Sequence, residues 1–199
     1  KVAEVNGLKC FDTFTGFKFL AEKKDKLESS GEGNVIFSYE ESYGYMLGSY
    51  VRDKDAVTAA LLLTEMAAWY ADQGKTLADA LEGLYAKYGC YAEHTYNLVM
   101  PGLDGLKDMA NLMKSLRENP PAELSGVKVL QFKDYSDGSV IDCATGAKSA
   151  MELSGSNVLR FEMADGTSVI VRPSGTEPKI KVYILAQGAD AADAAANVE

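Results

Sequence analysis

Four short apolar runs separated by glycine-containing turns constrain the fold of the C-terminal half most strongly. The turns are Asp137-Gly138, Asp165-Gly166 and Ser174-Gly175, and such pairs favour the tight reversals that join antiparallel strands. An antiparallel sheet is therefore expected from the runs 127–132, 157–163, 168–171 and 179–185. A periodic helix over 103–118, ended by Asn119-Pro120-Pro121, would cover one face of this sheet.

The N-terminal half alternates strand-like and helical patterns. Short strands are expected over 8–13 and 34–39, and helices after Gly16, over 56–71 and over 76–88. The run 56–71 is apolar on nearly every side, so we expect it to be buried between a sheet and another helix. The alternation predicts a partial mixed α/β domain over 1–92, followed over 93–199 by an α+β domain whose antiparallel sheet is covered by helices.

The net charge of the chain disfavours two classes of binding partner. The 20 basic and 29 acidic side chains give a net charge of −9, which repels nucleic acid and anionic membrane surfaces. No run reaches the roughly 20 apolar residues that span a bilayer, and no signal peptide is recognisable. Cys10, Cys90 and Cys143 lack the spacing of a metal or redox site, so we expect no metal ligands and a cytoplasmic location.

The segment from Arg172 to Pro178 has the composition of an anion-binding loop. Arg172 can present a planar fork to phosphate oxygens, Ser174 and Thr176 supply hydroxyls, and Gly175 lets backbone N–H groups approach an anion. An ordinary tight turn rich in glycine, proline and serine is equally compatible with these residues.

A second segment, from Tyr39 to Gly44, places Glu40, Glu41 and Ser42 among aromatic rings. Carboxylates accept paired hydrogen bonds from neighbouring sugar hydroxyls, and rings cover the apolar faces of sugars. A solvated loop that merely ends a strand is the more frequent origin of such a segment. Glycoside hydrolysis is disfavoured, because adjacent carboxylates on one strand point to opposite sides.

Four segments together carry a family resemblance. In chain order, 15–18, 40–45, 52–55 and 172–178 resemble the third and fourth domains of the α-D-phosphohexomutases, of the phosphoglucomutase and phosphomannomutase type. The resemblance implies an isomerase that moves a phosphoryl group between O1 and O6 of a hexose, through a phosphoserine and a 1,6-bisphosphate intermediate. Phosphopentomutases, and a non-catalytic phosphosugar-binding module, stay open as alternatives.

The resemblance also implies roles for particular residues. Glu40 and Ser42 would contact sugar hydroxyls, and Lys54 would assist at the reacting phosphate. Phe17 stands where some relatives have histidine, so Lys18 is a second, weaker catalytic candidate. The implied substrate-binding residues are Thr15, Gly16, Glu40, Ser42, Arg52, Arg172, Ser174, Gly175 and Thr176.

The resemblance covers two of four domains. The phosphoserine segment and the aspartate-rich magnesium loop of the family belong to the earlier domains, and neither is recognisable here. The sequence also begins without methionine, and its final helical pattern, 189–198, ends without a cap. We therefore expect a fragment that is inactive alone. Its partners would be a hexose phosphate and the N-terminal domains, with Mg²⁺ bound by those domains and glucose 1,6-bisphosphate as activator.

Overall fold

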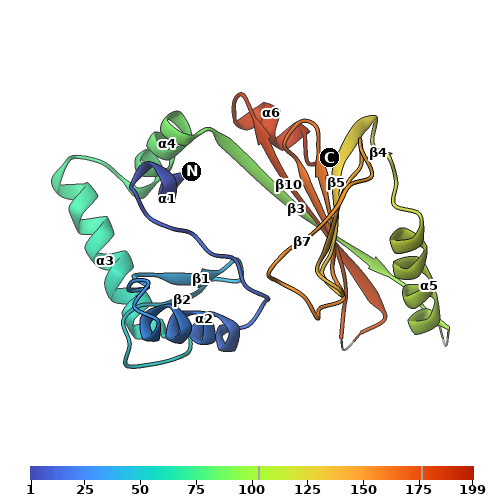
Figure 1. Ribbon diagram of the computed structural model, residues 1–199. Helices are drawn as coiled ribbons and strands as arrows, with labels where there is room; N and C mark the ends of the chain where they lie inside the picture. The colour runs from blue at the N-terminus through green and yellow to red at the C-terminus, as the bar shows by residue number, and fades with distance from the viewer. Residues whose placement is uncertain (103, 176) are drawn as a thin grey trace. The chain divides into compact units, whose positions relative to one another are not determined.

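The computed structural model describes residues 1–102, 104–175 and 177–199. The chain divides into two compact units, Lys1–Tyr88 and Gly89–Glu199, and each is described by itself (Figure 1). The sequence-based division after residue 92 falls inside a strand, β3 (Cys90–Val99), which pairs along its whole length with a strand of the second unit.

The first unit contains three long helices, one short helix and one small hairpin. Its elements are α1 (Val2–Val5), α2 (Phe17–Ser29), β1 (Ser38–Glu40), β2 (Gly44–Met46), α3 (Ala56–Asp72) and α4 (Leu77–Tyr88). The side chain of Asp55 accepts the Val57 N–H at 3.0 Å and so caps α3. Thr76 and Asp79 exchange hydrogen bonds at the start of α4, as in a capping box. The three expected long helices are thus confirmed.

The expected strands of this unit are largely wrong. Residues 8–13 form no regular structure, and of 34–39 only the last two residues belong to a strand, β1. The reason lies at Val35, whose N–H is accepted by the Glu28 carboxylate at 3.2 Å and whose carbonyl accepts from Lys24 at 3.4 Å. Side chains of α2 therefore satisfy the backbone groups that a neighbouring strand would otherwise bind.

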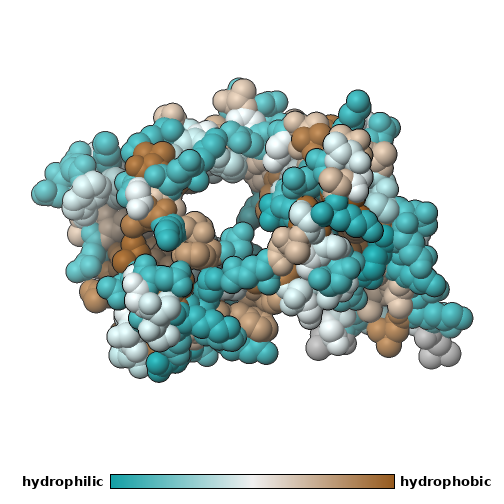
Figure 2. Space-filling view, viewed as in Figure 1, coloured by the Kyte–Doolittle hydropathy of each residue, from teal (hydrophilic) through white to brown (hydrophobic). Residues whose placement is uncertain are grey.

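Helix α3 contacts α4 and β2, but the expectation that it is buried is wrong. None of its residues is buried, and Val57, Leu61 and Trp69 are 78%, 59% and 61% exposed. The hairpin's two strands have three residues each, too few to cover a helix about 25 Å long. Figure 2 shows apolar side chains at the surface around α3. Among the described residues, no helix combines the length and apolar character needed to cross a bilayer.

Among its described residues, the second unit is built on an antiparallel sheet of eight strands. The strand order is β3-β10-β9-β8-β5-β6-β7, and β4 pairs with β5. The expected antiparallel sheet is therefore confirmed, with β3, β4, β6 and β7 as additions that the sequence did not indicate. The elements besides β3 are α5 (Gly105–Glu118), β4 (Glu123–Leu124), β5 (Val127–Asp134), β6 (Ser139–Asp142), β7 (Lys148–Ala150), β8 (Leu159–Met163), β9 (Ser168–Pro173), β10 (Lys179–Gly188) and α6 (Ala191–Ala196).

One hydrophobic core lies between α5 and this sheet. Met113 of α5 is 2% exposed and packs in a cluster with buried side chains of four strands. The cluster comprises Met113, Val129, Phe132, Leu159, Phe161, Met163, Val171 and Ile180. Helix α5 therefore covers one face of the sheet, as the sequence predicted, and α6 contacts β3 and β10 at their paired ends.

Truncating a core leucine tests this packing. Leu159→Ala removes a side chain that is 0% exposed, so we expect it to lower the free energy of unfolding by about 2–5 kcal/mol. The matched control is Leu130→Ala on the neighbouring strand, where the side chain is 47% exposed and the expected loss is below about 1 kcal/mol. Urea titrations followed by circular dichroism measure both. Equal losses in the two variants would contradict the assigned core.

Candidate functional site

The hairpin of the first unit brings two predicted segments together. Glu40 ends β1, and its Oε1 accepts a hydrogen bond from the backbone N–H of Gly16. Gly16 precedes the first residue of α2 with a φ of 125°, a conformation open mainly to glycine. The Glu40 carboxylate therefore meets the positive end of α2, and the structure brings Glu40 to Gly16, two of the predicted site residues.

Lys54 joins the same site through Phe17. The ring of Phe17 packs so tightly against Gly44 that a Cβ there would lie 2.5 Å from it, and 3.4 Å from Cδ of Lys54. The Lys54 Nζ lies 5.4 Å from the ring centre, within reach of a cation–π attraction. We call Gly16, Phe17, Glu40, Gly44 and Lys54 the hairpin cluster.

The ammonium group of Lys54 is paired with Asp53 but remains accessible to solvent. Its side chain is 63% exposed, and its Nζ lies 3.3 Å from Oδ1 of Asp53. The same oxygen accepts the Lys54 backbone N–H at 2.7 Å. These contacts, the backbone bond foremost, lower the pKa of Asp53, so this carboxylate stays ionised beside the ammonium. Ser42 lies in the exposed turn between β1 and β2, next to the cluster in sequence.

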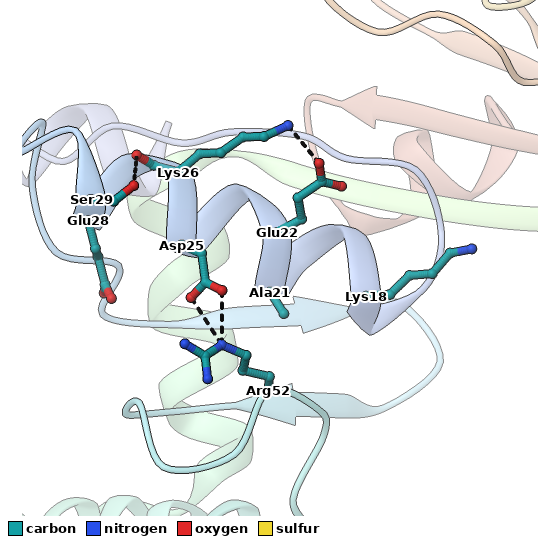
Figure 3. A pocket seen from close by; sticks show the side chains of 8 residues that line it. All are labelled: Lys18, Ala21, Glu22, Asp25, Lys26, Glu28, Ser29 and Arg52. Atoms are coloured by element: carbon teal, nitrogen blue, oxygen red, sulfur yellow. Dashed lines mark hydrogen bonds and ion pairs between the residues drawn. The ribbon is translucent and has the colours of Figure 1, made fainter.

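Arg52 and Lys18 have side-chain partners outside the hairpin cluster. Both line an open pocket of about 640 Å³ along α2 (Figure 3), which neither Glu40 nor Lys54 lines. The Arg52 Nε donates to both carboxylate oxygens of Asp25, at 3.1 and 2.9 Å. The Lys18 Nζ lies 4.7 Å from the ring centre of Phe19. The Cγ of Lys18 would lie 4.0 Å from a Cβ added at Gly16, so Lys18 lies beside the hairpin cluster, whereas the Arg52 side chain is held by Asp25.

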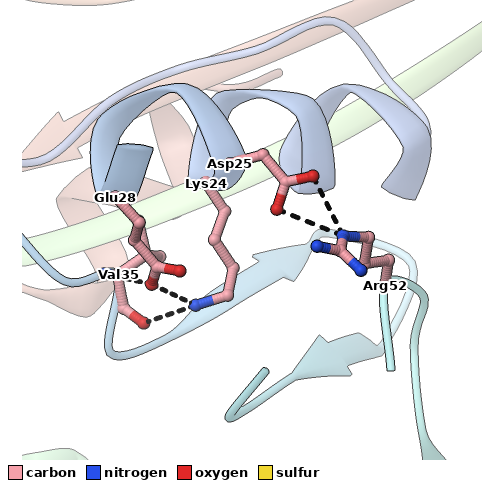
Figure 4. Close-up of polar contacts among 5 residues, drawn as sticks. All are labelled: Lys24, Asp25, Glu28, Val35 and Arg52. Atoms are coloured by element: carbon pink, nitrogen blue, oxygen red, sulfur yellow. Dashed lines mark hydrogen bonds and ion pairs between the residues drawn. The ribbon is translucent and has the colours of Figure 1, made fainter. Parts of the chain in front are cut away.

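A buried lysine fixes the segment that leads into β1. Lys24 is 5% exposed, and its Nζ contacts the Glu28 carboxylate and the Val35 carbonyl (Figure 4). The hydrogen bond from Lys24 is the main cause that lowers the pKa of Glu28. The role of Lys24 and Glu28 in holding the chain that ends at Glu40 depends on contacts with Val35 that the spacing of residues does not reveal.

The predicted anion loop forms one wall of a cavity in the second unit. Arg172 and Pro173 end β9, and Ser174 and Gly175 begin the turn toward β10. The Ser174 N–H donates to the Lys179 carbonyl at 2.9 Å, which closes the base of the turn. The cavity measures about 400 Å³ and is lined by Met109, Ala110, Met113, Ser156, Asn157, Arg172, Pro173, Ser174 and Gly175. Thr176, the remaining predicted member, lies outside the described residues.

The described residues do not fit a resident metal ion. No group of three or more His, Cys, Asp or Glu side chains among them could hold one. His94, the only histidine, lies in β3 opposite Ile184 with its ring 4.3 Å from that of Tyr96.

Comparisons with known proteins match both units. The family model for phosphoglucomutase/phosphomannomutase, alpha/beta/alpha domain III, matches residues 1–88. The model for the phosphoglucomutase/phosphomannomutase C-terminal domain matches residues 109–198.

Individual relatives agree with these matches. A phosphoglucomutase from Staphylococcus aureus strain N315 is 37% identical over 197 residues, which is 99% of this chain and 35% of the relative. One from the bovine strain RF122 / ET3-1 is 38% identical over 183 residues, 92% of this chain and 33% of the relative. This chain thus spans about a third of the length of these relatives.

A solved structure shares the fold. It is the open form of the exocytosis-sensitive phosphoprotein pp63/parafusin, a phosphoglucomutase from Paramecium. The TM-score is 0.60 at 22% identity, over 96% of this chain and 31% of that chain.

Adding one methyl group to the hairpin cluster tests its packing. Gly44→Ala forces the Phe17 ring aside, and we expect it to lower the free energy of unfolding of the first unit by about 1–3 kcal/mol. The control is Gly83→Ala in α4, where a Cβ meets nothing within 4 Å and a gain of about 0.5–1 kcal/mol is expected. Thermal unfolding of both variants measures these changes in stability. A neutral Gly44→Ala would contradict the contact.

Proposed function

Because the chain belongs to the phosphoglucomutase/phosphomannomutase family, we propose that it is the sugar-recognising and phosphate-binding part of a hexose phosphate mutase. The complete enzyme would interconvert hexose 1-phosphate and hexose 6-phosphate through a phosphoserine and a 1,6-bisphosphate. The observation that carries the proposal is the cavity that Arg172, Ser174 and Gly175 line. Domain 3 of the family would correspond to 1–92 and domain 4 to 93–199.

The cavity suits the phosphate that does not react. An arginine fork, a hydroxyl and an accessible backbone beside a glycine are donors that match phosphate oxygens. An enzyme that binds its substrate in two opposite orientations can use one site to hold the phosphate that does not react. Binding energy at that end then positions the other end for phosphoryl transfer. We assign this role to Arg172, Ser174 and Gly175, with Thr176 as a fourth member.

The hairpin cluster suits the sugar and the reacting end. One oxygen of Glu40 is held by the Gly16 N–H, which orients the carboxylate and leaves acceptor capacity for sugar hydroxyls. Ser42 and Thr15 would add polar contacts from the adjacent turn and helix start. The exposed ammonium of Lys54 would neutralise charge on the transferring phosphoryl group. Arg52 would first have to leave Asp25, so we prefer Lys54 to Arg52 for this role, with Lys18 as the weaker candidate.

Several components of the reaction would come from outside this chain. We assign Mg²⁺ and the phosphoserine to domains that precede this chain in the complete enzyme, and we expect the chain alone to be inactive. Glucose 1,6-bisphosphate would serve as activator. We place the enzyme in the cytoplasm, in keeping with three free cysteines, Cys10, Cys90 and Cys143.

Two substitutions in the complete enzyme test this division of labour. Arg172→Ala should raise KM for glucose 1-phosphate about 10–100-fold, because it removes charge-assisted hydrogen bonds worth about 1.5–3 kcal/mol. Lys54→Ala should instead lower kcat, because it removes a charge that acts in the transition state. Steady-state mutase assays give both constants.

Lys148→Ala serves as the control, since Lys148 is an exposed residue of β7, outside both sites, and its loss should change neither constant. If Arg172→Ala and Lys54→Ala also leave kcat/KM unchanged, the assignment of both sites is wrong.

A further inference from the structure

Asn157 lies where the anion loop begins. In the antiparallel ladder of β8 and β9, Leu159 pairs with Val171. Asn157 lies two residues before β8, at the end of the ladder from which β9 continues to Pro173. Asn157 also lines the same cavity of about 400 Å³ as Arg172, Ser174 and Gly175.

The orientation of the Asn157 amide is fixed by Arg117. The Arg117 Nη2 donates to Oδ1 of Asn157 at 2.8 Å. A guanidinium has donors only, so the amide atom that faces it must be the oxygen. The amide nitrogen therefore faces away from Arg117, and within the described part of the chain it has no hydrogen-bond partner. Asn157 is exposed, so two N–H donors are available to a ligand in the cavity.

Arg117 is itself anchored by a buried carboxylate. Its Nε lies 2.5 Å from Oδ2 of Asp134, whose side chain is 5% exposed. The other oxygen of Asp134 accepts from the N–H and the hydroxyl of Ser136, at 2.9 and 2.7 Å. Because Asp134 is held on both sides, Arg117 and the amide it binds are held in turn. Such support reduces the entropy lost when a ligand binds.

We propose that Asn157 is a further phosphate-binding residue, whose amide N–H donates to an oxygen of the anion held by Arg172, Ser174 and Gly175. Arg117 acts as a positioning residue through Asn157. The inference rests on the proposed function, because it takes this cavity as the phosphate site. Residues 156 and 157 form one wall of the cavity. From this wall the Asn157 amide would donate to phosphate oxygens, which accept hydrogen bonds.

Replacing the Asn157 amide by a carboxylate distinguishes an effect on phosphate binding from an effect on folding. Asn157→Asp keeps the shape, removes both donors and places a negative charge in the cavity. Its carboxylate should still bind Arg117, now as a charge-assisted pair, so the melting temperature should not fall. We expect the Kd for inorganic phosphate, measured by NMR titration of the 199-residue chain, to rise at least about 10-fold. Asn119→Asp adds the same charge at an exposed residue outside the cavity and should change the Kd less than twofold.

Two further variants test the positioning role. Arg117→Lys should weaken phosphate binding a few-fold, since lysine lacks the fork that reaches Asp134 and Asn157 together. Combined with Asn157→Ala, it should add nothing to the loss that Asn157→Ala causes alone. In the unsubstituted chain, the side-chain NH₂ resonances of Asn157 should shift with phosphate at the same Kd as the Gly175 amide.

The outcomes distinguish this inference from the proposed function. If Arg172→Ala abolishes saturable phosphate binding while Asn157→Asp and Asn157→Ala keep the Kd within twofold, the role of Asn157 is wrong and the phosphate site stands. If Arg172→Ala also leaves the Kd unchanged, the cavity is not a phosphate site and both proposals fail.

Discussion

The packing of α5 against the antiparallel sheet is the constraint on which the second unit depends. Met113 is buried among side chains of β5, β8, β9 and β10, so the helix fixes which face of each strand is internal and thereby the register. That register sets where β9 ends. Because the turn after Pro173 opens beside Met109 and Met113, the same core that stabilises the sheet also forms the inner wall of the proposed phosphate cavity.

The first unit positions its polar site by a different means, through side chains that bind backbone. Glu40 accepts the N–H at the start of α2, and Lys24 and Glu28 hold the segment around Val35. A carboxylate proposed to recognise a sugar thus also fixes the helix that presents Thr15 and Gly16. Loss of Glu40 would therefore affect local structure and ligand contacts together, which is why Lys54 is the cleaner probe of this site.

Local signals predicted much of this structure. The glycine turn at 166 joins β8 to β9 as expected, whereas the turn at 138 leads to β6, a strand that the sequence did not indicate, and the helical pattern over 76–88 predicted α4. Contacts between distant residues were not predictable: Val35 leaves the expected strand because α2 satisfies its backbone, and Arg52 meets Asp25, 27 residues away. The motifs singled out Glu40 and Arg172 as candidates, whereas Asn157 carries no local signal, because its orientation depends on Arg117, 40 residues earlier.

The central claim is that the second unit binds phosphate between α5 and the turn after β9. A crystal structure of the chain grown with glucose 6-phosphate tests it most directly. We predict the phosphate in the cavity of about 400 Å³, in contact with Arg172 and Ser174. A phosphate bound instead along α2, with Arg52 released from Asp25, and none beside Arg172, would contradict the account.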